Sequence, residues 1–217
     1  MEIGTAMDTA LTYLFDPLCG WCYGAGPALE KLAQTPGIAL KLAPTGLFAG
    51  KGARLMNTEF AAFAWSNDQR IAHLTGQAFS EAYRRNCLLA PGARFDSGPA
   101  TLALTAVALS APPRERDALK AIQHARYLDG RDVTTFAVLS EILRDLDLNE
   151  AAQHIAAPDE GLLAANDVRV AQARSDMRRS GAEGVPALLV GADERCRLVQ
   201  ASALLGSLDV LIAGLQG

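Results

Sequence analysis

Short apolar runs at the two ends of the chain predict strands, and helical spacing of apolar residues fills the region between them. Residues 11–15 form a β-favouring, mostly apolar run that Pro17 ends. From Gly24 onward apolar residues recur at helical spacing up to residues 36–37, and residues 38–42 alternate as a strand does. Strands joined by a helical crossover usually pair in parallel, so the opening predicts a β-α-β unit.

The region 57–180 shows no convincing strand pattern and predicts six or seven helices packed on one another. Ser97 ahead of Pro99 signals a helix start, and Gly181 signals a helix end. The region after it predicts a hairpin and a last helix. Residues 187–190 and 196–199 are apolar runs separated by a five-residue polar loop with glycine, and residues 204–215 are amphipathic.

The candidate chemistry lies in a Cys-Gly-Trp-Cys segment between the first predicted strand and the first predicted helix. Cys19 and Cys22 stand three positions apart, close enough to close a small disulfide ring. Amides at the start of a helix stabilise a thiolate there. The segment therefore predicts a redox-active cysteine pair.

A second motif supports a family resemblance. Gly184, Val185 and Pro186 stand immediately before the third predicted strand, and together with the cysteine pair they resemble the thioredoxin superfamily. The long helical region between the two halves is similar to the DsbA-like branch, and residues 15–24 resemble its cytosolic members named as protein-disulfide isomerases. The resemblance covers the chain from Leu11 onward.

This resemblance implies an α/β, thioredoxin-like fold with a large all-helical insertion between a β-α-β half and a β-β-α half. We expect residues 10–56 and 181–217 to form the thioredoxin-like domain and residues 57–180 to form the helical insertion domain. The implied activity is that of a protein-disulfide oxidoreductase or isomerase, which exchanges disulfides with protein or small-molecule thiols.

The family also implies roles for individual residues. Cys19 would be the nucleophile that attacks a disulfide, and Cys22 the buried partner that resolves the mixed disulfide. Pro186 would be a cis-proline opposite the pair, leaving Val185 free to dock an extended substrate. Trp21, placed by the loop at the surface, either contacts substrate or serves packing.

Three neighbours of the cysteines bear on the direction of electron transfer and on proton transfer. Gly20 and Trp21 supply no charge to stabilise a thiolate, so we expect a reduction potential nearer the reducing than the oxidising end of the superfamily. Asp16 precedes a proline and predicts a turn, with tuning of Cys19 or proton relay as the alternative.

Composition limits the classes of function and the cellular location that we expect. The chain has 217 residues, half of them apolar, and 20 basic against 24 acidic side chains, which gives a net charge of −4. Such a chain can bury a full core and shows no electrostatic footprint for nucleic acid. Residues 1–9 lack the basic stretch of a signal peptide, and no apolar run is long enough for a membrane span. We expect a cytoplasmic protein, in which a cysteine pair is catalytic more often than structural.

Other classes of function stay open. The same architecture resembles kappa-class glutathione transferases and hydroxychromene-carboxylate isomerases, although those relatives generally carry serine at the position of Cys19. An interaction module with an inactive cysteine pair is a third interpretation.

A zinc site would need Cys19 and Cys22 to converge with distant ligands from the set Cys87, Cys196, His73, His124 and His154. Cys87 and Cys196 are expected to be small buried side chains.

We expect no metal and no cofactor, with glutathione open as a co-substrate. The expected partners are proteins or small molecules that contain a disulfide or thiol, and neither nucleic acid nor membrane. The sequence leaves the oligomeric state open.

Overall fold

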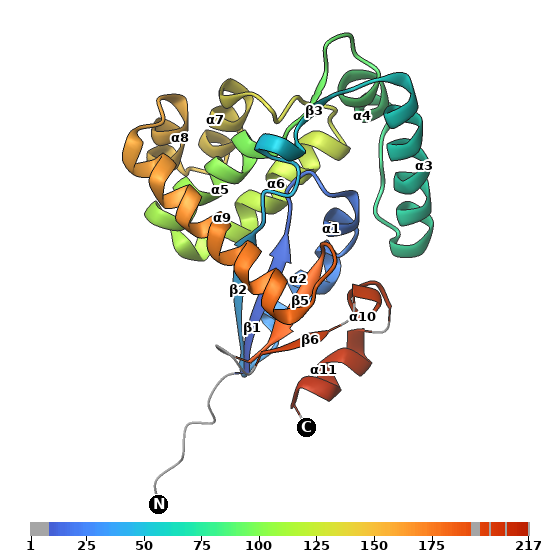
Figure 1. Cartoon of the computed structure of the whole chain (residues 1–217), viewed down its shortest axis with the longest axis vertical. Helices are drawn as coiled ribbons and strands as arrows, with labels where there is room; N and C mark the ends of the chain where they lie inside the picture. The colour runs from blue at the N-terminus through green and yellow to red at the C-terminus, as the bar shows by residue number, and fades with distance from the viewer. Residues whose placement is uncertain (1–8, 192–195, 200, 207, 217) are drawn as a thin grey trace, which may run out of the picture.

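A four-stranded mixed sheet forms the centre of the molecule (Figure 1). The computed structural model describes residues 9–191, 196–199, 201–206 and 208–216. Strand β1 (Thr9–Phe15) pairs in parallel with β2 (Ile38–Pro44) and antiparallel with β5 (Ala187–Val190), and β5 pairs antiparallel with β6 (Arg197–Val199). The predicted β-α-β opening and the closing hairpin are both confirmed.

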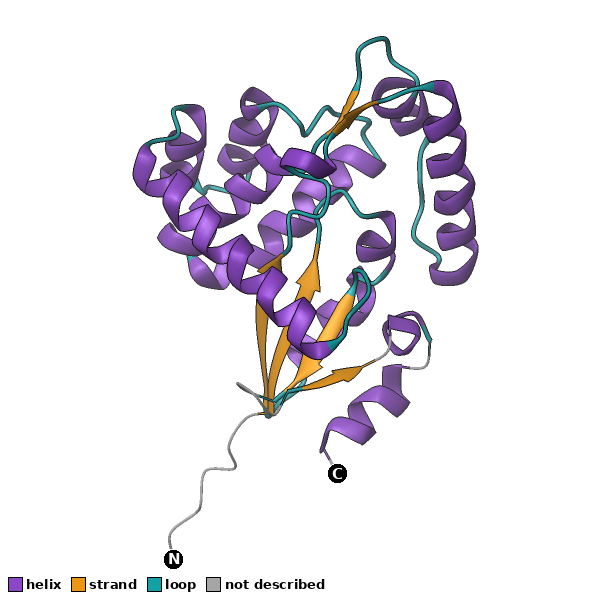
Figure 2. Cartoon of the chain, in the orientation of Figure 1, coloured by secondary structure: helices purple, strands orange, loops and turns teal. Residues whose placement is uncertain are grey.

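Strand β1 is buried on both faces, as a central strand covered by helices is expected to be. Tyr13 and Phe15 stack with ring centroids 5.5 Å apart and belong to the main core cluster. Leu14 points to the other face, where it packs with Ala173 of a long helix and with Ala187 of β5. That helix, α9 (Glu160–Ser180), crosses one face of the sheet, as Figure 2 shows. The sheet is thus the middle layer of the fold.

Two helices connect β1 to β2. The short helix α1 (Gly20–Gly24) follows the first strand, and α2 (Gly26–Gln34) continues the chain with a proline in its first turn. Ala25 separates them because its amide still bonds back to Trp21, while its own conformation begins the next helix. The sequence predicted one helix here; the break places the cysteine segment on a short helix of its own.

Seven α-helices lie between residues 57 and 180, a region that the structure describes throughout, and this agrees with the six or seven predicted. They are α3 (Thr58–Thr75), α4 (Glu81–Tyr83), α5 (Gly98–Ser110), α6 (Glu115–Tyr127), α7 (Phe136–Asp145), α8 (Asn149–Ala156) and α9. Helix α4 continues into a π-helical turn (Arg84–Leu88), and 3-10 turns occur at Gly50–Gly52 and Pro112–Arg114. The expected end of α9 at Gly181, in the left-handed conformation, is confirmed.

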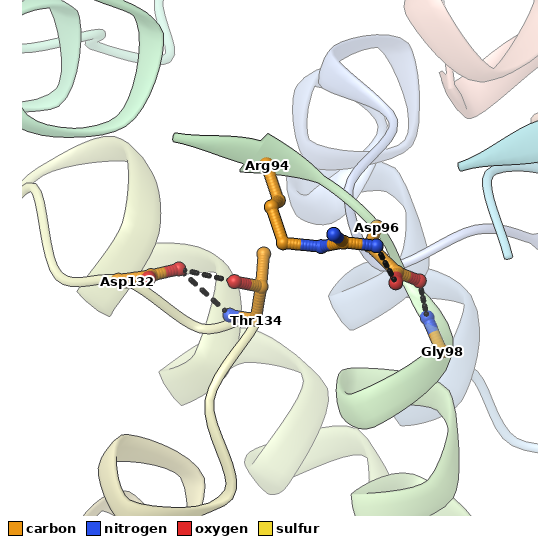
Figure 3. A network of polar contacts seen from close by, with 5 residues as sticks. All are labelled: Arg94, Asp96, Gly98, Asp132 and Thr134. Atoms are coloured by element: carbon orange, nitrogen blue, oxygen red, sulfur yellow. Dashed lines mark hydrogen bonds and ion pairs between the residues drawn. The ribbon is translucent and has the colours of Figure 1, made fainter. Parts of the chain in front are cut away.

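Aspartate side chains form short-range hydrogen bonds just ahead of α5 and α7 (Figure 3). Asp96 accepts a hydrogen bond from the backbone amide of Gly98 at 2.9 Å and pairs with Arg94 at 3.4 Å. Ahead of α7, Asp132 accepts from both the amide and the hydroxyl of Thr134 in the same way. These Asx turns satisfy backbone amides that otherwise lack a partner within the chain segment.

The structure corrects three predictions. Residues 57–180 are not free of strands, because β4 (Arg94–Phe95) pairs antiparallel with β3 (Arg54–Leu55); two-residue strands carry no periodicity that a sequence could display. The predicted last helix is two helices, α10 (Ala201–Leu205) and α11 (Leu208–Gln216), with Gly206 after the first. Strand β6 begins one residue later than predicted, and residues 192–195 of the predicted loop lie outside the described residues.

The division into a thioredoxin-like domain of residues 10–56 and 181–217 and a helical insertion of 57–180 stays a prediction. Within the described part of the chain, every helix is too short or too polar to cross a lipid bilayer.

Candidate active site

The cysteine segment follows the carboxyl end of strand β1, where α1 begins. Cys19 is the N-cap residue of α1, in an extended conformation, and the amide of Tyr23 bonds back to its carbonyl at 3.0 Å. Cys22 lies inside the first turn. Cys19 and Cys22 are 6% and 2% exposed, and both are free thiols in this structure. The pair therefore sits at the positive end of a helix, as the sequence predicted.

The Val185–Pro186 segment lies directly opposite Cys19, although 166 residues separate the two in sequence. The Val185–Pro186 peptide bond is cis, as the family resemblance implied. The thiol of Cys19 donates a hydrogen bond to the carbonyl oxygen of Val185, with sulfur and oxygen 3.6 Å apart. The structure thus brings together the two motifs that the sequence singled out.

The two thiols differ in their surroundings. Burial raises the pKa of Cys22 well above its usual range, and the neighbouring Cys19 raises it further through a hydrogen bond and through charge repulsion. Since a charged sulfur is disfavoured at such a site, Cys22 stays protonated while Cys19 is free. This asymmetry favours Cys19, at the end of the helix, as the sulfur that reacts first.

Asp16 is fully buried below the pair. Its carboxylate accepts hydrogen bonds from the amide of Leu18 at 2.9 Å, the amide of Phe48 at 3.1 Å and the hydroxyl of Ser97 at 2.7 Å. Burial raises the pKa of Asp16, and these hydrogen bonds oppose the rise. The turn predicted at Asp16 is confirmed by the Leu18 contact; its role in proton relay stays a prediction.

An apolar groove adjoins Cys19. A cavity of about 220 Å³ lies between the cysteine segment and α3, lined mostly by aromatic and small side chains, among them Trp21, Phe60 and Phe63. The guanidinium of Arg70 lies 5.7 Å from the centroid of the Trp21 ring. Trp21 is half-buried, whereas the sequence analysis placed it at the surface. Phe63 is 63% exposed at the edge of the groove. Trp21 forms a wall that a bound substrate can contact.

Asp68 of α3 brings a buried carboxyl group to this groove. It is 5% exposed, and the hydroxyl of Tyr83 donates to it at 2.9 Å. Burial raises its pKa to about 7, against the opposing effects of the Tyr83 hydrogen bond and of Arg126. A Cβ atom added at Gly20 would lie only 2.5 Å from Oδ1 of Asp68, so the carboxyl packs against the residue between the cysteines.

Sequence analysis missed Asp68, and the signal for it was weak. Ala61, Asp68 and Ile71 follow helical spacing and are the buried positions of α3, so an acid interrupts an apolar stripe. A charged residue at such a position is rarely buried without a partner, which is the pattern that could have identified it.

Arg126 of α6 is a buried positive charge that lowers the pKa of Asp68. It is 1% exposed, and its guanidinium lies 5.3 Å from the ring centroid of Tyr83 and 5.4 Å from that of Phe95. Two of its nitrogen atoms find no hydrogen-bond partner among the described residues. Helix α6 also supports the cysteine segment directly, because the hydroxyl of Tyr127 donates to the carbonyl of Leu18 at 2.7 Å.

The other two cysteines do not line the groove at Cys19. Cys87 is buried and its thiol donates to the carbonyl of Arg131 at 3.4 Å, which confirms the expectation of a small buried side chain. Cys196 is half-buried, against the same expectation, since it packs at the edge of the cluster around Leu14. Among the described residues no group of three or more potential ligands gathers in the way a metal ion requires.

Comparisons with known proteins agree with this geometry. The model of the DSBA-like thioredoxin domain family matches residues 10–210. The chain belongs to this family. Its fold and its thiol-disulfide oxidoreductase activity follow from that membership and from the relatives below. The comparison with curated proteins found no match.

The solved structures include proteins that match this chain over almost its whole length. The cytosolic disulfide reductase DsbM from Pseudomonas aeruginosa is 32% identical, with a TM-score of 0.82 over 95% of this chain and 97% of that one. A second structure of DsbM, with GSH, is 33% identical over the same shares of both chains, with a TM-score of 0.80. A 2-hydroxychromene-2-carboxylate isomerase is 16% identical with a TM-score of 0.63, over 95% of this chain and 96% of that one, and shares the fold.

Proposed function

We propose that this family member reduces disulfide bonds in extended, apolar polypeptide segments, with Cys19 as the attacking sulfur and Cys22 as the resolving one. The observation that carries the proposal is the placement of the Cys19 thiol 3.6 Å from the carbonyl of Val185, at the mouth of an aromatic groove. A substrate strand lying along Val185 and Pro186 would present its disulfide to that sulfur, while its flanking apolar side chains enter the groove.

The exchange proceeds in two balanced steps. The Cys19 thiolate attacks one sulfur of the substrate disulfide, forms a mixed disulfide, and releases the other substrate sulfur as a thiolate that takes up a proton. Cys22 then loses its proton and attacks the Cys19 sulfur. This step closes the Cys19–Cys22 disulfide and releases the second substrate thiol. The substrate gains two electrons and two protons, and the cysteine pair loses them.

Regeneration of the dithiol needs a reductant, for which glutathione is our proposal. Two glutathione molecules would reduce the Cys19–Cys22 disulfide and leave as one glutathione disulfide, with electrons balanced. Two observations support this direction: the uncharged residues Gly20 and Trp21 between the cysteines, and the DsbM relative, which is a reductase and whose structure has been solved with GSH. By the same relation to DsbM we infer a cytoplasmic location.

A trapping experiment tests the proposal. Cys22→Ser leaves Cys19 able to attack but removes the sulfur that resolves the mixed disulfide. Incubated with cell extract and captured under non-reducing conditions, this variant should accumulate mixed disulfides with proteins at Cys19. Cys19→Ser with Cys22 intact should capture none, and Cys87→Ser should behave as the wild type, because the Cys87 thiol bonds to the carbonyl of Arg131 and does not line the groove.

The outcomes also separate the glutathione-dependent isomerase or transferase from the oxidoreductase. Adducts with glutathione alone would favour the former, and no adduct at all would favour a binding role. The presence of thiols at both positions supports disulfide exchange, because a one-sulfur site cannot close an internal disulfide.

A further inference from the structure

A second cavity, larger than the groove at Cys19, lies between α2 and α6. It encloses about 370 Å³, within the range of small-molecule sites in proteins. Its walls include the buried leucines Leu29 of α2 and Leu119 of α6. Tyr23 separates it from the groove, because Tyr23 lines this cavity while its ring stacks, at 4.7 Å, on Tyr127, which lines the groove. Disulfide exchange as described above makes no use of this cavity.

Gln123 gives the cavity an unsatisfied donor. The side chain lines the cavity and is 4% exposed, and its Nε2 amide group has no hydrogen-bond partner among the described residues. A buried amide donor left without an acceptor costs about 1–3 kcal/mol. An acceptor oxygen on a bound molecule would remove that cost, so Gln123 points to a ligand with an acceptor at this end of the cavity.

The charged side chains that line the cavity favour an anionic ligand. Arg116 and Lys120 contribute two positive charges, and Glu30, whose Oε1 lies 3.4 Å from Nε of Arg116, contributes one negative charge. Burial and the nearby Lys120 lower the pKa of His124, which therefore adds no charge near neutral pH. The lining carries one net positive charge, which a monoanion neutralises and a phosphate dianion would exceed.

We propose that the cavity binds a small organic molecule with a single carboxylate group. The carboxylate would accept hydrogen bonds from Gln123 and Arg116, and an apolar body would lie against Leu29 and Leu119. A planar carboxylate suits this donor pair, because amide and guanidinium groups present their hydrogens in a plane. The proposal is independent of the direction and substrates of disulfide exchange.

Fluorine NMR with para-fluorobenzoate as the probe tests this proposal on the full chain. We expect saturable binding, and binding at least tenfold weaker for the neutral isostere para-fluorobenzamide. Arg116→Gln and Gln123→Leu should each weaken binding of the benzoate by about tenfold, which corresponds to about 1.4 kcal/mol. Lys51→Gln removes a charge from an exposed turn outside the cavity and should leave binding unchanged.

Several results would overturn the proposal. The first is no saturable binding of the benzoate up to about 10 mM, which corresponds to a binding free energy weaker than about 3 kcal/mol. The second is binding of the amide as tight as that of the benzoate, and the third is benzoate binding by both cavity variants that is unchanged from the wild type. Tighter binding of inorganic phosphate than of the benzoate would also refute the assignment of a carboxylate. Gln123 is buried, so its variant is checked by thermal unfolding; Arg116 is partly exposed and keeps the test decisive if the Gln123 variant fails to fold.

Discussion

The buried carboxyl of Asp68 should make stability fall as pH rises toward neutrality. Its pKa is raised to about 7 from a usual value of 3.8. Between those values the folded protein keeps a proton that the unfolded chain has lost, so raising the pH favours the unfolded chain. The stabilising effect of that bound proton is fully present at pH below 3.8 and is lost as the pH passes through 7.

The size of this effect follows from linkage. Each pH unit well inside that window costs about 1.4 kcal/mol of unfolding free energy, and the slope falls to half at the folded pKa, so the change between pH 5 and pH 7 is about 2 kcal/mol. Asp68→Asn removes the titrating group and can keep an acceptor for Tyr83. The difference in unfolding free energy between this variant and the wild type should therefore shift by about 2 kcal/mol in favour of the variant over this interval.

Urea unfolding at pH 5, 6, 7 and 8 measures this difference. The variant should gain steadily on the wild type from pH 5 to pH 7, and the difference should level off above that. Asp167→Asn, at an exposed position of α9, supplies the control and should show no such trend. A difference between Asp68→Asn and the wild type that stays constant with pH would refute the reasoning, since it would mean that Asp68 is ionised throughout.

Further predictions concern the cysteine segment. Gly20→Ala places a methyl group 2.5 Å from Asp68 and should lower the unfolding free energy by about 1–3 kcal/mol. Gly214→Ala, whose added Cβ would meet no atom of the described residues within 4 Å, should not lower it, and equal urea midpoints for the two variants would contradict this. Equilibration with a glutathione buffer should give the Cys19–Cys22 pair a reduction potential of about −200 mV or lower, and a value near −120 mV would exclude the proposed direction. Cys19→Ser should abolish reduction of a protein disulfide, measured by the turbidity that develops when the reduced substrate protein precipitates. Retained activity would place the attacking sulfur elsewhere.

Local signals in the sequence were sufficient to predict the first two strands of the sheet and the redox-active cysteine pair. The run at residues 11–15 and the alternation at 38–42 are periodic over several residues, and both became strands. The pairing of Val185 with Cys19 needed the family resemblance, because nothing between the two positions shows that the chain returns to the same place.

The parts that sequence analysis missed depend on contacts between distant segments. Strand β4 exists only because residues 54–55 lie beside it. Asp68 and Arg126 look like ordinary charges on helices, and only the packing of α3 and α6 against the cysteine segment reveals that both are buried. Side chains that tune a site from outside its motif are therefore the least accessible to sequence reasoning.

In the proposed mechanism, the burial of Cys22 also governs how long a captured substrate stays attached. Once Cys19 is in a mixed disulfide, the repulsion between the two sulfurs is gone, but burial still raises the pKa of Cys22. Release waits for the small fraction of Cys22 that is ionised, so the lifetime of the covalent complex should lengthen as the pH falls. A long-lived complex gives a polypeptide with several cysteines time to rearrange before it departs.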